Sequence, residues 1–309
     1  MKKFTILVFS AFLLAGCTTA EPAPACDKTQ FVDHVILDVP VQEGTTVMPG
    51  TIFTKTWQVR NDGTCDWTSD YALVHTGGKA MAAEEEIALP PVASGETVDL
   101  SVRMKAPSAA GGYASEWMLR NAAGELFGVG PQGDRPLTAE LVVPELPAGV
   151  VYDFTQVVCL ARWDSGRAEF LPCDGEDDEQ GELDGYVRLA PNGTIEVKPN
   201  NQQGGWIAGY FPPIVIEEGE HFRATVGCVD ENPDCAVAFI FKFETTDGTQ
   251  AILGDPQPLS GETRIEFDLD LSPLAGQEII MILEMQENGG RSLEARGFWL
   301  NPRIERAIQ

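Results

Sequence analysis

The sequence is short of basic residues and of histidine. Lys and Arg total 21 against 47 Asp and Glu, His numbers 3, and the formal net charge is -26 at pH 7. Nucleic-acid-binding proteins need a basic surface to meet phosphates, so this class is excluded, as is electrostatic adhesion to anionic lipid. We expect the acidity to give solubility and repulsion between copies.

The chain also lacks the motifs of common catalytic and metal centres. It contains no G-x-S-x-G, no H-E-x-x-H, no glycine-rich phosphate loop before a helix and no C-x-x-C. His34, His75 and His221 stand apart from the cysteines, so a zinc site is not expected. These absences predict a protein without enzymatic activity, metal or cofactor.

Residues 1–17 carry the most specific short pattern. Lys2 and Lys3 form a positive n-region, and the apolar run that follows is too short to cross a bilayer, which predicts a signal peptide. The motif LAGC at 14–17 resembles a bacterial lipobox. That resemblance implies cleavage before Cys17 and lipidation of its sulfur, hence a membrane anchor; a plain secretory signal is the alternative.

A Pro- and Ala-rich tether is expected over residues 18–29. Of seven cysteines, all but Cys17 remain for pairing, and an even number in an exported chain predicts disulfides. Locality favours Cys26–Cys65, Cys159–Cys173 and Cys228–Cys235. The alternative for Cys26 is a free thiol beside the tether.

The first half of the chain is organised around residues 49–67, PGTIFTKTWQVRNDGTCDW. Turn signals bound an aromatic-rich strand over residues 52–59, which needs a second sheet to cover it. Strict alternation over residues 98–105 predicts a half-buried antiparallel strand. These patterns predict a β-sandwich.

Two further stretches belong to this pattern, VDLSVRMKAP at 98–107 and GGYASEWMLRN at 111–121. Together with residues 49–67 they make residues 30–145 resemble the four-tryptophan, NBR1-type immunoglobulin-like domain. Trp57, Trp67 and Trp117 fall where three of the family's tryptophans fall, and we expect them in the core. The final stretch of the domain, GVGPQGDRPLTAELVV, contains no fourth tryptophan. The resemblance implies an immunoglobulin-like sandwich that docks a protein or acts as a spacer.

The second half reads as a further β-sandwich. Residues 144–150, PELPAGV, predict the boundary. Over residues 151–309, short alternating runs separated by turn signals predict a jelly-roll-like β-sandwich. The runs are 186–189, 194–198, 206–211, 221–227, 236–243, 264–271, 278–285 and 295–300. The last of these resemble the final strands of jelly-roll carbohydrate-binding modules, which implies a polysaccharide ligand.

A candidate ligand platform lies in WIAGYF at 206–211. Trp206 and Tyr210 share one face of this strand. If that face is outward, the two rings form an apolar platform with polar tips, suited to stacking on a sugar, and Trp299 would join it. The alternative is a central strand with both faces covered.

Two acidic stretches offer further chemistry. The loop DGEDDEQGELDG at 174–185 has oxygen ligands that suit calcium, although its spacing is not that of an EF-hand, and a solvated charge run is the alternative. Glu266, Asp268 and Asp270 resemble the E-x-D-x-E catalytic strand of one glycosidase group. The alternative is that these acids face water.

Together the patterns predict an all-β, lipid-anchored protein at the cell surface, outside the cytoplasm. It would bind a polysaccharide or an envelope partner through its second sandwich, without catalysis. A docking or spacer lipoprotein and a jelly-roll glycoside hydrolase are the alternatives.

Overall fold

The computed structural model describes residues 25–36, 44–176, 179–289 and 294–306. The predicted signal peptide, Cys17 and most of the tether lie outside these residues. Within them, no helix has the length and apolar character needed to cross a membrane.

Strands β1 to β9 form a first sandwich of two sheets. One sheet has the order β1 (Thr29–Ile36), β3 (Ile52–Asn61), β6 (Thr97–Lys105). The other has the order β2 (Thr45–Thr46), β9 (Leu137–Val143), β7 (Gly111–Arg120), β4 (Ala72–Gly78), β5 (Glu86–Ala88), with β8 (Leu126–Phe127) on β7. All these pairings are antiparallel except that of β2 with β9.

Aromatic side chains fill the space between these two sheets. Trp57, Trp67 and Trp117 are at most 1% exposed. The Trp57 and Trp117 rings lie 6.5 Å apart, and the Trp57 indole donates a hydrogen bond of 2.8 Å to the Thr138 carbonyl. The β6 alternation foreseen from sequence is observed, because Leu100 points inward between exposed polar neighbours. The tryptophans therefore hold the two sheets together.

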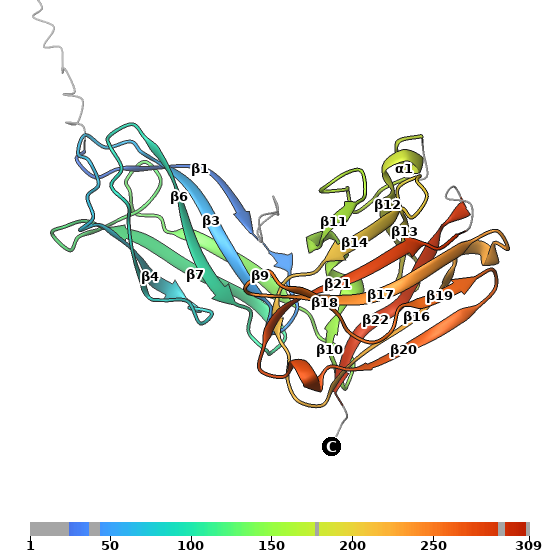
Figure 1. Cartoon of the computed structure of the whole chain (residues 1–309). Helices are drawn as coiled ribbons and strands as arrows, with labels where there is room; N and C mark the ends of the chain where they lie inside the picture. The colour runs from blue at the N-terminus through green and yellow to red at the C-terminus, as the bar shows by residue number, and fades with distance from the viewer. Residues whose placement is uncertain (1–24, 37–43, 177–178, 290–293, 307–309) are drawn as a thin grey trace, which may run out of the picture.

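Two further sheets form the second sandwich (Figure 1). The back sheet has the order β12 (Tyr186–Ala190), β13 (Thr194–Lys198), β22 (Gly297–Arg306), β16 (Glu220–Cys228), β20 (Arg264–Asp270), with β10 (Val150–Asp153) on β22. The front sheet has the order β11 (Arg162–Ser165), β14 (Trp206–Tyr210), β21 (Glu278–Glu287), β17 (Ala236–Thr245), β18 (Gln250–Ile252), with β15 (Ile214–Val215) on β21 and β19 (Gln257–Ser260) on β17.

The long strands of this half, from β16 to β22, alternate between back and front sheets, as in a jelly roll. The predicted all-β fold class is confirmed. A short helix, α1 (Glu179–Asp184), lies inside the acidic loop. Three 3-10 turns complete the described elements: η1 (Phe154–Leu160), η2 (Val229–Glu231) and η3 (Ser272–Leu274).

Trp299 belongs to the core of the second sandwich. Its side chain is 0% exposed, and its ring lies 5.0 Å from Phe239 and 5.5 Å from Phe267. The expectation that Trp299 joins an exposed platform is therefore wrong, because the inner faces of both sheets close over the indole.

All three local disulfides foreseen from the sequence are formed. Cys26 pairs with Cys65, Cys159 with Cys173, and Cys228 with Cys235, with Cα–Cα distances of 4.8, 5.0 and 6.3 Å. Cys26 is thus not a free thiol.

The two sandwiches meet at one end of β3. The Ile52 amide donates a hydrogen bond of 2.8 Å to the Pro213 carbonyl, and the Arg103 guanidinium contacts both Glu278 oxygens at 2.6 and 2.5 Å. The other end of β3 lies beside the Cys26–Cys65 disulfide, since the side-chain amide of Asn61, the last residue of β3, donates a hydrogen bond of 3.0 Å to the Cys65 carbonyl. Ten residues of strand therefore separate the N-terminal entry from the second sandwich by about 30 Å.

Candidate functional site

The candidate site is the outward surface of the front sheet. Ile207 in β14 and Phe211 directly after it point inward and are at most 1% exposed, whereas Trp206 and Tyr210 point outward and are partly exposed. Gly209 also points inward, where a Cβ would come within 2.6 Å of the Trp163 ring. The packing of Trp163 and Phe211 thus fixes which face of the strand is outward.

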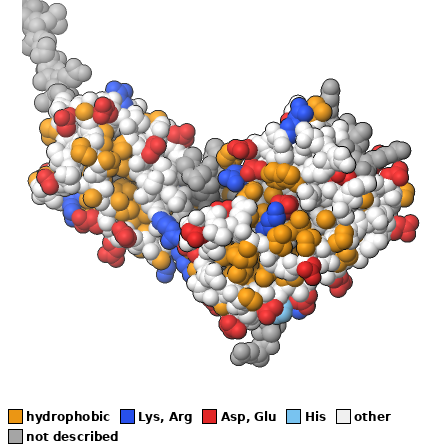
Figure 2. Space-filling model, in the orientation of Figure 1, with side chains coloured by type: hydrophobic (Ala, Val, Ile, Leu, Met, Phe, Trp, Pro, Cys, Tyr) orange, Lys and Arg blue, Asp and Glu red, His pale blue; other side chains and the backbone are white. Residues whose placement is uncertain are grey.

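Strand register places the outward residues of β14, β21 and β17 in three rows. The rows centre on β21 residues Ile282, Glu284 and Gln286. We call this surface the front face, and its residues are Trp206, Ala208, Tyr210, Ala238, Ile240, Lys242, Ile282, Glu284 and Gln286. Figure 2 shows hydrophobic side chains on this side of the second sandwich, with charged groups among them.

One ion pair lies inside this apolar surface. Lys242 Nζ contacts Glu284 Oε2 at 2.5 Å, and the side chains are 22% and 11% exposed. Ile240 and Ile282 beside them are 6% and 1% exposed. The pair therefore presents a donor and an acceptor, with no net charge, in surroundings that exclude most water.

Tyr210 lies at the β11 side of the front face. The Arg162 guanidinium carbon sits 4.4 Å from its ring centroid, and Arg162 also pairs with Asp164 at 2.9 Å. Burial raises the pKa of the Tyr210 hydroxyl, while a side-chain hydrogen bond with Gln250 acts in the opposite direction. One ring face of Tyr210 is thus occupied by a cation that is itself neutralised.

Sequence reasoning missed four residues in or beside this site: Arg162, Lys242, Glu284 and Phe170. The Phe170 ring lies next to Arg162, with 5.8 Å between the guanidinium carbon and the ring centroid. A signal for two of them was present. Lys242 is the single basic residue of AVAFIFKFET, and Glu284 interrupts the apolar run IIMILEM. A charge within an otherwise apolar strand is expensive to bury unless it is paired, so two such strands suggest a pair. No pattern in the neighbouring sequence indicated Arg162 or Phe170.

The acidic loop at 174–185 gives no metal centre among the residues that are described. Residues 177–178 lie outside the described part, and Asp184 pairs with Arg167 at 2.7 Å. No group of three or more His, Cys, Asp or Glu side chains in the described ranges could hold a metal ion. Calcium binding here stays a prediction.

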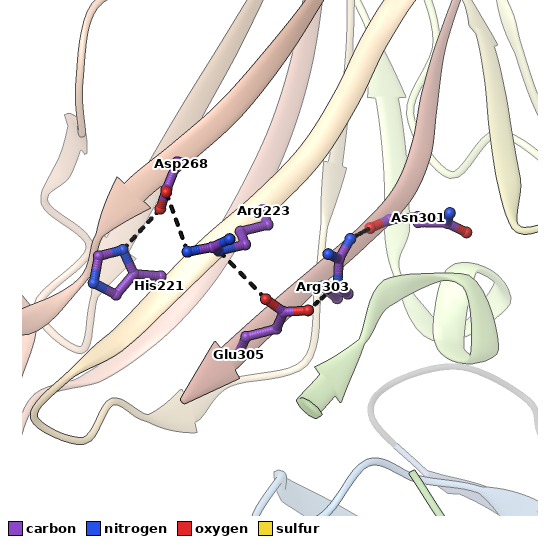
Figure 3. Close-up of polar contacts among 6 residues, drawn as sticks. All are labelled: His221, Arg223, Asp268, Asn301, Arg303 and Glu305. Atoms are coloured by element: carbon purple, nitrogen blue, oxygen red, sulfur yellow. Dashed lines mark hydrogen bonds and ion pairs between the residues drawn. The ribbon is translucent and has the colours of Figure 1, made fainter. Parts of the chain in front are cut away.

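The acids of β20 lie on the back sheet, on the opposite side of the sandwich from Trp206. Glu266, Asp268 and Asp270 are exposed, while Phe267 between them is buried. Figure 3 shows the Asp268 carboxylate between His221 and Arg223, at 2.8 and 3.1 Å.

The same network continues along β22. Arg223 reaches Glu305 at 3.3 Å, and Arg303 joins Glu305 at 2.5 Å and the Asn301 carbonyl at 3.0 Å (Figure 3). The arrangement is that of acids on the solvent side of a half-buried strand.

Among solved structures, the chain resembles carbohydrate-binding modules of the β-sandwich superfamily, with 10% identity and a TM-score of 0.32 over 91% of this chain and 99% of that one. It also resembles the xylan-binding module CBM15, with 10% identity and a TM-score of 0.31 over 48% and 92% of the chains. Similarity at this level does not extend to function.

Sequence relatives cover part of the chain. Protein ILRUN of Danio rerio is 34% identical over 91 residues, which cover 29% of this chain and 32% of that protein. Protein JOKA2 of Solanum tuberosum is 37% identical over 97 residues, covering 30% and 11%. The human Next to BRCA1 gene 1 protein is 29% identical over 120 residues, covering 38% and 12%. The chain thus spans about a third or less of the length of these relatives.

The family model described as the Ig-like domain from next to BRCA1 gene matches residues 40–148. This match confirms the immunoglobulin-like domain expected from Trp57, Trp67 and Trp117. Residues 40–148 thus form an immunoglobulin-like domain similar to that of the NBR1 family, and a second β-sandwich follows it.

Proposed function

We propose that this protein is a lipid-anchored, non-catalytic surface protein that binds a neutral polysaccharide on its front face. The observation that carries the proposal is that the Lys242–Glu284 pair lies on the same face of the sheet as two partly exposed aromatic residues, Trp206 and Tyr210. Ligand sites combine apolar and aromatic surface with a few well-placed polar groups in this way.

The chemistry of the front face matches a sugar chain. Sugar rings present C–H faces, which stack on aromatic rings such as the Trp206 indole, and a rim of hydroxyls. The ammonium of Lys242 would donate to a hydroxyl, and the carboxylate of Glu284 would accept from one. Because these charges neutralise each other and the chain carries -26 overall, a neutral polysaccharide fits better than an anionic one.

The layout of the chain suits presentation away from a membrane. An anchor at Cys17 would enter beside the Cys26–Cys65 disulfide, at the end of the first sandwich far from the second. The first sandwich would then hold the front face about 30 Å further out than the disulfide. Anchoring would raise the local concentration of binding sites near the envelope.

Affinity electrophoresis in gels that contain xylan, galactan, glucomannan or mixed-linkage β-glucan tests the binding proposal. Full-length protein should be retarded by at least one polymer, and Trp206→Ala should lose most of that retardation with little change in Tm. Leu189→Ala is the control, since Leu189 is 49% exposed on the back sheet. If no polymer retards the wild type, the binding proposal is refuted.

The anchor is tested separately. Cells that express the protein should incorporate radiolabelled palmitate into it, and Cys17→Ala should abolish the label. A wild-type protein that stays unlabelled and is released in soluble form would contradict lipidation.

Protein docking by the first sandwich is the second candidate. A groove of about 660 Å³ lies beside β1 and is lined by Phe31, His34, Arg135 and Leu137, among others. Phe31 is 43% exposed there, which is unusual for so large an apolar side chain. Cross-linking on whole cells should capture a partner through residues 30–145 if this role is correct, and none if it is not.

A further inference from the structure

A groove between the two sandwiches opens at the Tyr210 end of the front face. Its volume is about 380 Å³, and both sandwiches line it. The first contributes Ile52, Thr54 and Arg103; the second contributes Phe170, Tyr210 and Glu278, among others. Tyr210 belongs to both the front face and the groove, so the two surfaces are continuous.

The groove is bridged by direct contacts between its walls. Arg103 holds both oxygens of Glu278, and the Ile52 amide bonds the Pro213 carbonyl. Pro212 and Pro213 stiffen the second wall, since each fixes its own backbone φ. A site formed before binding avoids the entropic cost of ordering, which would favour ligand entry.

Phe170 is the most unusual residue of the groove. It is 65% exposed, and its φ of 57° lies in the left-handed region that bulky side chains avoid. The Asp164 carboxylate accepts a hydrogen bond of 3.1 Å from the Phe170 amide, and the Cys159–Cys173 disulfide spans this loop. Strain of this kind collects at functional sites.

The ring of Phe170 extends the aromatic row of the front face. The Arg162 guanidinium carbon lies 5.8 Å from the Phe170 centroid and 4.4 Å from that of Tyr210. Three planar groups therefore stand together at the mouth of the groove. The cations here are paired, Arg162 with Asp164 and Arg103 with Glu278, so the groove offers no excess positive charge. Glu244 in the same lining adds a carboxylate, which accepts a hydrogen bond of 2.7 Å from the Gln250 side chain.

We propose that a neutral polysaccharide chain bound on the front face continues past Tyr210 into this groove, where Phe170 and Arg103 contact it. This inference rests on the proposed function and adds that the first sandwich contributes to the site. Trp206 and Tyr210 are four residues apart on one strand, about 13 Å, so a short oligosaccharide would span them. A longer chain would need the groove as well.

Calorimetric titration of the full chain with tri- and hexasaccharides of xylan, galactan, glucomannan and mixed-linkage β-glucan tests the extension. The wild type should bind the hexasaccharide of the retarding polymer more tightly than its trisaccharide. Phe170→Asn and Arg103→Gln should each weaken hexasaccharide binding about tenfold, the loss of one good contact, and change trisaccharide binding less than twofold. Asn tolerates the left-handed backbone, so Phe170→Asn removes the ring while keeping the loop.

Matched controls separate these effects from surface changes elsewhere. Phe31→Ala removes another exposed aromatic ring, and Arg120→Gln removes another surface guanidinium, paired with Glu86 at 2.5 Å. Both should bind hexasaccharide as the wild type does. If Trp206→Ala abolishes binding while Phe170→Asn and Arg103→Gln stay within twofold of the wild type, the extension into the groove is overturned and the proposed function stands. If no oligosaccharide or polymer binds the wild type, both are overturned.

Discussion

The Lys242–Glu284 pair allows a test that separates stability from ligand binding. Lys242→Met would leave the Glu284 carboxylate, whose side chain is 11% exposed, without its cation. Glu284→Leu would leave the Lys242 ammonium without its carboxylate. Breaking a buried pair costs about 3–5 kcal/mol. Because Lys242 keeps 22% of its side-chain exposure, we expect about 2 kcal/mol for each single variant.

The double variant Lys242→Met/Glu284→Leu should behave differently. Both replacements are apolar and similar in length to the residues removed, and Ile240 and Ile282 surround them. We therefore expect its free energy of unfolding to lie within about 1 kcal/mol of the wild type. The double-mutant cycle then gives a coupling energy of about 3 kcal/mol.

Urea unfolding followed by tryptophan fluorescence measures the cycle, and affinity electrophoresis on the same samples measures binding. The double variant should be folded and stable but should lose polysaccharide retardation, because no donor or acceptor remains at this point. If the costs of the two single variants sum to that of the double variant within about 0.5 kcal/mol, the coupling is refuted. A stable double variant that binds as the wild type does would refute the assignment of the pair to the ligand surface.

Two further predictions concern the fold. Gly209→Ala should lower the free energy of unfolding by about 1–3 kcal/mol, because the new Cβ would lie 2.6 Å from the Trp163 ring. Gly112→Ala is the control, since no atom lies within 4 Å of its new Cβ, and it should leave the free energy of unfolding unchanged. Equal effects of the two variants in thermal unfolding would contradict this reasoning. Burial, together with the hydrogen bond and negative charge of Asp27, raises the pKa of Tyr71 from 10.0 to about 12, so the folded state favours the neutral phenol. The stability that the neutral Tyr71 phenol contributes is complete below pH 10 and is lost as the pH rises towards 12. The loss of stability between pH 10 and 12 should therefore be smaller in Tyr71→Phe than in the wild type. An unchanged dependence of stability on pH in this variant would refute the assignment.

Much of the fold could be predicted because its signals are local. Period-two alternation separates the two faces of a strand, so the runs at 194–198, 264–271 and 278–285 correspond to β13, β20 and β21. Short strands escaped prediction. β11 and β15 have four and two residues, too few for a period to be recognised, and they are held by pairing with β14 and β21.

The candidate site was predictable only in part. WIAGYF shows that Trp206 and Tyr210 share a face, yet an alternating strand looks the same whichever face is covered. Trp299 illustrates the limit, because its own strand has the same aromatic character but its side chain meets Phe239 of the opposite sheet. Which ring is exposed depends on the position of the second sheet, and no local pattern encodes that position.

The sequence by itself determined the longer strands, their turns, the three disulfides and the immunoglobulin-like domain. These follow from alternation, from the spacing of cysteines and from aromatic residues within short windows. Only the tertiary structure decided that Lys242 meets Glu284, that Phe170 stands beside Arg162 and that Arg103 closes a groove against Glu278. These contacts join strands distant in the chain, and sheet order and the docking of two sandwiches fix them through packing over the whole molecule.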